Sequence, residues 1–255
     1  MYPAERHKWL IDTATDEGRV SVSRASDELG VVPETIRRDL EYLASQGLLR
    51  RVHGGAIPAS FDTLGDQPLD TRDSSAVSEK EAIAQAALAY LPADRGSIVL
   101  DAGSTTARLA ALLPATSRFT VFTDSAPIAS VVAARTACDV QLIGGRVRST
   151  TQATVGNSRE LERLRVDVAF IGTNGVSLTH GFSTPDIEEA ATKAAMVSCA
   201  HTVVALVDSR KIGAESTARF AEISDVDVLI TDEGISDRQR RGLEEEGLKV
   251  VVAVL

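Results

Sequence analysis

Two pairs of adjacent arginines, Arg37-Arg38 and Arg50-Arg51, lie near the start of the sequence. Arginine donates hydrogen bonds from a flat, permanently charged group, so it can bind a phosphate or the O6 and N7 atoms of guanine. The pairs therefore suggest contact with a nucleic acid, although arginines are equally common on a solvated protein surface. The elements that hold them must decide between these two possibilities.

Residues 4–58 have the pattern of three short helices followed by a hairpin. The third helix, within "VVPETIRRDLEYLASQG", has Pro33 in its first turn, apolar residues at helical spacing, and Gly47 as its stop. The next stretch, "LLRRVHGGAIP", alternates and then turns on Gly54-Gly55, which predicts a two-stranded wing. Together these elements predict a winged helix-turn-helix.

In a helix-turn-helix the last helix lies in the major groove, and its first residues contact base edges. We assign base contacts to Glu34, Thr35, Arg37 and Arg38. Contacts to the phosphate backbone, which fix register and affinity but not sequence, are assigned to Arg50, Arg51, His53 and Gly54. The expected partner is double-stranded operator DNA.

The net charge of −9 does not by itself favour DNA. Residues 1–60 hold eight Lys/Arg against nine Asp/Glu, a net of −1, so composition is silent for this region. Residues 61–255 hold 19 Lys/Arg against 27 Asp/Glu, a net of −8, so most of the acidity lies outside the predicted winged helix. A local basic surface remains compatible with the acidic total.

A second group of residues could bind an anion. The segment "LDAGSTTARLAALLP" reads as a strand, a turn and a helix, so backbone N–H groups and hydroxyls gather at a helix N-terminus. The residues concerned are Asp101, Gly103, Ser104, Thr105 and Thr106. The segment lacks the Gly-Lys-Ser/Thr ending of a Walker loop, and it is also compatible with an ordinary capped turn.

Short β-branched strands alternate with helices from Gly96 onward, which predicts an α/β sheet covered on both faces. We predict strands in "SIVLD", "FTVFT", "DVQLIGG", "VDVAFIG", "TVVALVD", "DVLITD" and "LKVVVAVL". Ligands of such sheets bind at the carboxyl ends of strands, where we place Asp124, Ser125, Gly144, Gly145, Asp208 and Lys211.

The stretch "HGFSTPDIEEAATKAAM" opens another helix that carries Asp186, Glu189 and Lys193. Glu189 and Lys193 are four residues apart, so they could belong to the ligand site or form an ordinary surface ion pair. Lys211 likewise could meet a phosphate or a sugar hydroxyl, or be a solvated lysine.

The chain divides into a winged helix-turn-helix at 1–58, a polar linker at 59–77 and an α/β domain at 78–255. No apolar run is long enough for a membrane helix, and the N-terminus does not resemble a secretory signal, so a cytoplasmic protein without a membrane partner is expected. Cys138 and Cys199 lack the spacing of metal ligands, and no metal or other cofactor is expected.

The run "ETIRRDLEYLASQGLLRRVHGGA" resembles the DNA-binding domain of the DeoR family of bacterial transcription regulators. Asp101 to Thr106, Thr123 to Ser125, Gly144-Gly145, Gly181 to Asp186 with Glu189 and Lys193, and Asp208 to Lys211 are similar to motifs of that family's sensor domain. The resemblance implies a sensor with the fold of ribose-5-phosphate isomerase, in which these residues, Gly181 included, bind a phosphorylated sugar or polyol.

The resemblance further implies a repressor of a sugar uptake or catabolic operon, acting as a homo-oligomer, either dimer or tetramer. A fructose phosphate is our expectation for the effector. Three residues depart from the family pattern: Val32 at the cap of the third helix, Asp124 in place of Asn, and Arg210 in place of Ser. A sugar-phosphate isomerase or deaminase with an accessory DNA-binding domain is the alternative, since Asp101, Asp186, Glu189 and Lys193 could serve acid–base chemistry.

Overall fold

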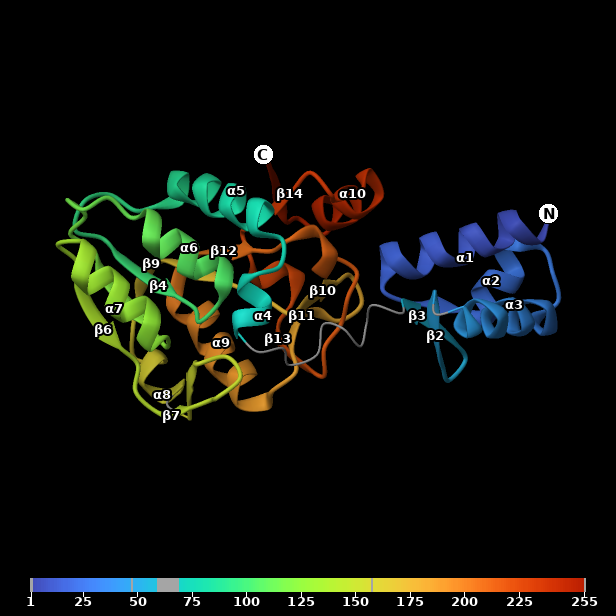
Figure 1. Cartoon of the computed structure of the whole chain (residues 1–255), viewed down its shortest axis with the longest axis horizontal. Helices are drawn as coiled ribbons and strands as arrows, with labels where there is room; N and C mark the ends of the chain where they lie inside the picture. The colour runs from blue at the N-terminus through green and yellow to red at the C-terminus, as the bar shows by residue number, and fades with distance from the viewer. Residues whose placement is uncertain (1, 47, 59–68, 157, 255) are drawn as a thin grey trace.

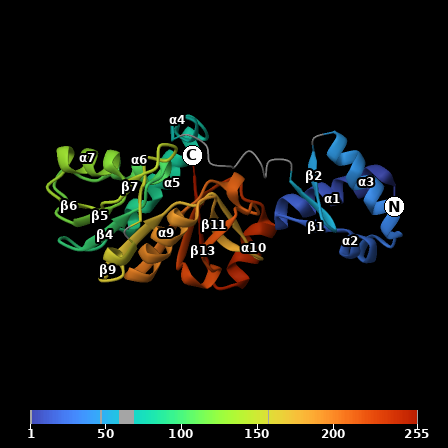
Figure 2. The ribbon, with the colours of Figure 1, turned by 90° about the horizontal axis from the view of Figure 1, so that it is seen from below.

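The structure is a computed structural model that describes residues 2–46, 48–58, 69–156 and 158–254. It places two bodies at opposite ends of the molecule, a small N-terminal domain and a larger α/β domain (Figures 1 and 2). No helix in these described ranges is both long and apolar enough to cross a bilayer.

The N-terminal domain is a winged helix-turn-helix, as predicted. Its helices are α1 (Pro3–Glu17), α2 (Val22–Leu29) and α3 (Pro33–Ser45), and its strands are β1 (Val20–Ser21), β2 (Leu49–Val52) and β3 (Gly55–Pro58). The predicted two-stranded wing gains β1 as a third, antiparallel strand, in the order β1-β3-β2. The stop predicted at Gly47 lies outside the described residues.

Leu10 of α1 and Ile36, Leu40 and Leu43 of α3 form the centre of this domain and are almost wholly buried. Their spacing on α3 leaves Glu34, Arg37 and Arg38 on the opposite, exposed face. The packing that stabilises the domain therefore also orients the helix that is expected to bind DNA.

The α/β domain contains a seven-stranded, entirely parallel sheet in the order β15-β14-β12-β9-β4-β5-β6. All seven predicted strands are present: β4 (Ser97–Leu100), β5 (Thr120–Thr123), β6 (Asp139–Leu142), β9 (Val166–Ile171), β12 (Ala200–Leu206), β14 (Val228–Asp232) and β15 (Lys249–Ala253).

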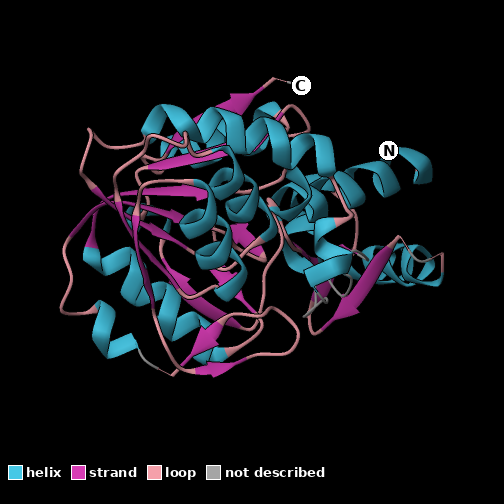
Figure 3. Ribbon diagram, turned by 60° about the vertical axis from the view of Figure 1, so that its left-hand side comes forward, coloured by secondary structure: helices cyan, strands magenta, loops and turns pink. Residues whose placement is uncertain are grey.

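Helices cover both faces of this sheet (Figure 3). Ile98 and Leu100 of β4 pack under α5 (Val77–Ala87), α6 (Ser104–Leu112) and α7 (Ala126–Arg135). Val99 lies on the other face, beneath α9 (Ile187–Cys199) and α10 (Asp237–Glu245). Two apolar cores on either side of one sheet explain why the strands are apolar at consecutive positions.

Smaller elements surround the site. Strands β10 (Gly175–Ser177), β11 (Gly181–Thr184) and β13 (Ala218–Ala221) form an antiparallel sheet, and β7 (Arg146–Val147) pairs with β8 (Thr154–Val155) as a two-stranded arm. One further short helix, α8 (Ser158–Leu161), lies beside α9. Cys199 is buried and Cys138 is half-buried, and neither forms a disulfide.

The predicted linker needs a correction at its C-terminal end. Residues 59–68 lie outside the described residues, but helix α4 (Leu69–Asp73) already packs against α6. Arg108 of α6 fixes it there through an ion pair with the Asp73 carboxylate and a 2.8 Å hydrogen bond to the Asp73 carbonyl. The segment 69–77 is therefore part of the α/β domain.

Candidate functional sites: a nucleic-acid interface and an anion site

The exposed face of α3 begins with Glu34, which lies 3.2 Å from Arg37 and 3.7 Å from Arg38. All three side chains are more than half exposed, and Thr35 is half-buried beside them. Val32 precedes the helix without a side-chain hydrogen bond to it, as its side chain predicted. In the chain without DNA, Glu34 thus partly neutralises the arginines that are assigned to the bases.

The two arginines of the wing differ. Residues on a strand alternate between faces, so Arg51 is exposed whereas Arg50 is half-buried with its Nε atom inside the domain. His53 and Gly54 form the exposed turn, where Gly54 has a φ of +76°. The prediction that both arginines face the phosphates is therefore supported by position for Arg51 alone.

Arg19 is an unpredicted member of the wing. It is exposed and donates a 3.1 Å hydrogen bond to the carbonyl oxygen of His53. Sequence reasoning missed it because β1, which brings residues 20–21 beside the wing, was not predicted. Arg19 and Arg51 together give the wing two exposed positive charges.

Asp39, within the run that resembles the DeoR family, stabilises the fold. Its carboxylate accepts hydrogen bonds from Arg6 at 2.6 and 3.0 Å and lies 2.9 Å from His7, so it joins α3 to α1. Burial opposes the charged form of Asp39, but the bonds from Arg6 and His7 outweigh it and lower its pKa.

The predicted anion site lies at the N-terminus of α6. Gly103 is the cap residue, and Ser104 and Thr105 are buried, with hydroxyls that have no partner among the described residues. The first N–H groups of a helix lack intrahelical acceptors and carry partial positive charge. Thr106 behaves differently, because its hydroxyl donates to the carbonyls of Asp101 and Gly103 and so closes the turn.

Basic side chains gather beside this helix end. Lys80 of α5 is 1% exposed and donates to the Arg72 carbonyl, and a Cβ added to Gly103 would lie 3.9 Å from the Arg72 guanidinium. Lys211 donates to the Thr173 carbonyl at 2.9 Å and lies 3.6 Å from Asp208.

Both buried lysines have altered acidity. Burial and the charge of Lys211 lower the pKa of Lys80 to about 8. Burial also lowers the pKa of Lys211 to about 8, although Asp208 opposes that shift. Asp208 itself is buried, yet Lys211 and Arg210 lower its pKa. Asp208 offsets the burial of these lysines only in part, so an added anion would favour the charged forms of both.

Sequence reasoning missed Arg72 and Lys80. Arg72 was placed in the linker, and Lys80 was given no role. Lys80 nevertheless shares a helical face with the buried residues Ile83, Ala84 and Ala87, and this spacing could have revealed it. Helix α5 begins at Val77, directly after Ala76 in the left-handed region.

A polar cluster lies just after the carboxyl end of β4, the strand that precedes α6. Oδ2 of Asp101 accepts hydrogen bonds from Lys193 at 2.5 Å and from the Gly172 N–H at 2.8 Å. Oδ1 of Asp101 is buried and accepts no hydrogen bond from the described residues. Such an oxygen is suited to accept a hydrogen bond from a ligand hydroxyl.

Glu189 and Lys193 are both buried, so the surface ion pair considered from their spacing is wrong. Glu189 accepts hydrogen bonds from Thr151 at 2.6 Å and Thr184 at 3.2 Å, and lies 2.9 Å from Arg148 of the two-stranded arm. Burial opposes ionisation of Glu189, but Lys193, Thr151 and Arg148 together lower its pKa. Asp186 caps α9 and lies 3.4 Å from Arg148.

Asp124 accepts a 2.8 Å hydrogen bond from the Ala102 N–H, directly beneath the anion-binding turn. Burial, followed by the charge of Asp101, raises its pKa well above the ordinary value. A protonated carboxyl neither repels a phosphate nor differs greatly in shape from the Asn of the family pattern. The raised pKa favours the neutral form of Asp124 in the folded protein.

The remaining predicted residues shape the backbone. Ser125 caps α7 by accepting from the Ile128 N–H. Gly144 and Gly145 lead into the arm, where a Cβ on Gly145 would overlap the Val155 carbonyl. Gly181, with a φ of +72°, is the first residue of β11 and lies against the Ala221 backbone. Among these four, the structure shows scaffolding roles and no side chain directed at the anion site.

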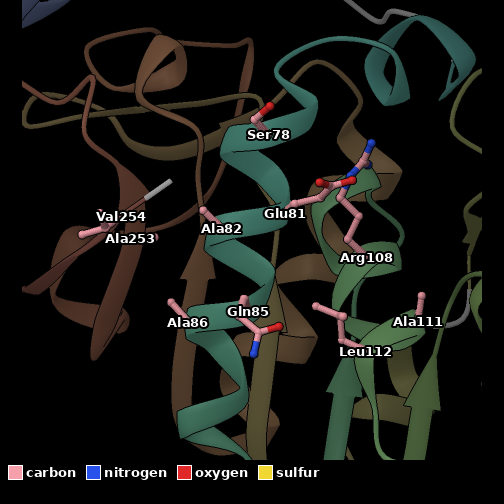
Figure 4. A pocket seen from close by; sticks show the side chains of 10 residues that line it. All are labelled: Ser78, Glu81, Ala82, Gln85, Ala86, Arg108, Ala111, Leu112, Ala253 and Val254. Atoms are coloured by element: carbon pink, nitrogen blue, oxygen red, sulfur yellow. The ribbon is translucent and has the colours of Figure 1, made fainter.

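A separate groove of about 950 Å³ lies between α5 and α6 and beside the end of β15 (Figure 4). Small and apolar side chains dominate its lining, including Ala82, Ala86, Leu112 and Val254. None of the residues predicted to bind the ligand lines this groove, so it is distinct from the anion site.

Two family models match the chain: the DeoR-like helix-turn-helix domain over residues 6–60 and the DeoR C terminal sensor domain over residues 75–233. The HTH-type transcriptional regulator GlpR of Haloferax volcanii is 35% identical over 257 residues, which cover 100% of this chain and 99% of that protein. The glycerol-3-phosphate regulon repressor of Escherichia coli strain K12 is 29% identical and covers 91% of this chain and 92% of that protein.

Among solved structures, the chain is similar to ribose 5-phosphate isomerase A from Methanocaldococcus jannaschii. The match covers 54% of this chain and 55% of the isomerase chain. Its sequence identity is 19% and its TM-score is 0.40.

Proposed function

Because this chain belongs to the DeoR family of transcription regulators, we propose that it represses an operon for uptake or breakdown of a sugar or polyol. Its binding to operator DNA is controlled by the phosphorylated form of that compound. We further propose that it acts in the cytoplasm as a symmetric oligomer, since two winged helices would contact two half-sites.

One observation carries the effector class. The N-terminus of α6, with Arg72, Lys80 and Lys211 around it, can bind a phosphate. Next to it, Asp101 offers a buried oxygen with no hydrogen-bond partner among the described residues. A cationic end joined to a hydroxyl-accepting end supports a ligand that carries both a phosphate and hydroxyl groups.

The absence of catalysis is also part of the proposal. Lys193 and Gly172 bind one oxygen of Asp101, and Arg148, Thr151 and Thr184 surround Glu189, whose pKa is lowered. A general base works best with a pKa near the working pH, and these contacts hold Glu189 below it. We expect no turnover of ribose 5-phosphate or glucosamine 6-phosphate, and measurable turnover would support the enzyme alternative.

The test is binding of the full chain to the DNA upstream of its own gene, over a salt series. Salt-sensitive affinity that changes with one of a set of phosphorylated compounds is the expected result. The set contains fructose 1-phosphate, fructose 6-phosphate and glycerol 3-phosphate, each paired with its unphosphorylated parent as a control. Binding that ignores salt, or a response to the parent alone, would contradict the proposal.

A further inference from the structure

The end of α1 contacts the α/β domain through two glycines. Gly18 and Gly213 have φ values of +75° and +90°, a region that favours glycine. A Cβ on Gly18 would overlap the Gly213 carbonyl, and a Cβ on Gly213 would overlap the Thr15 carbonyl. The two backbones thus approach so closely that neither position has room for a side chain.

Charged residues reinforce this contact and connect it to the rest of the DNA-binding domain. Glu17, the last residue of α1, forms ion pairs with Arg238 of α10 and with Arg24 of α2. Ser236 lies 3.4 Å from Asp16 across the same junction. Glu17 therefore joins the α/β domain to two helices of the winged helix.

Gly213 is also close in sequence to the candidate anion site, because it directly follows the turn formed by residues 208–212. The Asp208 carbonyl accepts from the Lys211 N–H at 3.0 Å, and the Ser209 carbonyl accepts from the Ile212 N–H at 3.1 Å, which makes one tight turn. The Lys211 side chain is bonded to Thr173, and the Gly213 N–H donates to Val176 at 2.7 Å. Only one residue separates Lys211 from the interdomain contact.

Two cavities lie beside this junction and share Gly213 in their lining. One of about 200 Å³ is lined by Thr15, Pro58, Arg210 and Gly213 among others, and one of about 370 Å³ by Glu17, Leu178 and Arg238 among others. Interfaces that are small and incompletely packed are those that shift between two arrangements.

We propose that residues 208–214 transmit occupancy of the anion site to the DNA-binding domain through the contact between Gly213 and Gly18. An anion that draws the Lys211 ammonium away from the Thr173 carbonyl shifts the turn, and Gly213 then changes its fit against Thr15 and Gly18. The inference rests on the proposed function and adds the route by which the ligand acts.

The chain supplies a matched pair of variants. Gly213→Ala and Gly247→Ala place alanine at the same φ of +90°, so the backbone strain is alike. Only Gly213→Ala meets the neighbouring domain, because nothing lies within 4 Å of a Cβ on Gly247. Gly18→Ala and Gly30→Ala form a second pair, both at helix ends with positive φ, and a Cβ on Gly30 likewise meets nothing.

Hydrogen–deuterium exchange of the full chain, with and without inorganic phosphate, tests the route directly. We expect phosphate to change exchange in residues 13–18 of the wild-type and Gly247→Ala proteins by at least twofold, and to leave Gly213→Ala unchanged there. Unchanged exchange in the wild type at phosphate concentrations that protect residues 103–107, or an unaltered response in Gly213→Ala, would overturn the inference.

DNA binding supplies the second measurement. The ratio of DNA affinities with and without the active sugar phosphate should fall to near one in Gly213→Ala and Gly18→Ala, while the affinity for the sugar phosphate itself stays within about threefold of the wild type. Gly247→Ala and Gly30→Ala should keep the ratio, roughly 5- to 150-fold for couplings of this kind. If no compound alters DNA binding of the wild type, the proposed function fails, and the exchange experiment still decides the route.

Discussion

Lys193 donates hydrogen bonds to Asp101, at 2.5 Å, and to the Gly172 carbonyl, at 3.0 Å, and not to Glu189 on the preceding turn of its own helix. The pair joins α9 to the end of β4 across 92 positions of sequence, and both side chains are buried. Buried partners of this kind depend on each other, because removal of one leaves the other charge without compensation.

Lys193→Met should therefore destabilise the protein by about 3–5 kcal/mol, the usual cost of an uncompensated buried charge. The double variant Asp101→Asn with Lys193→Met should recover a large part of that loss. Urea unfolding of the four proteins measures both effects. If the loss of stability in the double variant equals the sum of the two single losses, the two charges do not depend on each other.

Asp124→Asn should stabilise the unliganded protein at neutral and alkaline pH. Since the folded state holds the Asp124 proton above the pH at which the unfolded chain releases it, the contribution of Asp124 to stability falls as the pH rises from about 4. Asparagine removes this dependence and can still accept from the Ala102 N–H. The gain is about 1.4 kcal/mol for each unit by which the pKa is raised.

Thermal unfolding between pH 4 and 9 measures this gain. The two proteins should be similar at pH 4 and diverge upward from there, with the variant the more stable. A constant difference across the range would mean that Asp124 does not change its protonation on unfolding.

The affinity for a phosphorylated effector should fall as the pH rises from 7 to 9. Lys80 and Lys211, each with a pKa of about 8, are charged at pH 7 and lose their protons over this range, whereas the phosphate is already a dianion. Each lysine that must be protonated reduces affinity roughly tenfold between these two pH values. Isothermal titration calorimetry measures the slope.

Lys80→Met is the control for that profile. It should weaken binding at pH 7 and make the remaining decline shallower, because one of the two titrating groups is gone. An affinity that stays level to pH 9 in the wild type would exclude both lysines from contact with the anion.

The strand, turn and helix around the candidate anion site could be predicted from sequence because these elements are local. Only three residues separate β4, which ends at Leu100, from α6, which begins after Gly103, and β-branched runs marked all seven strands. Arg72, Lys80 and Arg148 could not be placed in the same way. They reach the site from α4, α5 and the arm, through packing of segments that are far apart in the chain.

The alternation of side chains along a strand could have distinguished the two arginines of the wing. Arg50 and Arg51 are adjacent on β2, so they must point to opposite faces, and only Arg51 is exposed. The interdomain contact could not be predicted from the local sequence. Gly213 resembles any other turn glycine, and only the fold brings Thr15 against it.

The hydroxyls of the anion-binding turn should separate by role. Thr105→Ala should weaken the effector response and leave stability almost unchanged, because its hydroxyl has no partner in the described chain. Thr106→Ala should instead destabilise the fold by about 1–3 kcal/mol, since the buried Asp101 carbonyl loses the Thr106 hydroxyl and the Gly103 carbonyl keeps only the Ala107 N–H. Effector titration and urea unfolding of both variants distinguish the roles, and equal behaviour would contradict them.

Arg37→Ala and Arg51→Ala should impair DNA binding in different ways. Arg37 lies on the exposed start of α3, where a bidentate contact to guanine contributes about 1–3 kcal/mol of discrimination, so its loss should relax sequence preference. Arg51 lies on the exposed face of the wing, so its loss should weaken binding to all sequences and reduce the salt slope by about one.

Arg50→Ala is the control, because that half-buried side chain should affect stability more than salt dependence. Anisotropy titrations with operator and scrambled duplexes at several salt concentrations measure each effect. A uniform loss of affinity from both Arg37→Ala and Arg51→Ala, on both duplexes, would contradict this division between base and phosphate contacts.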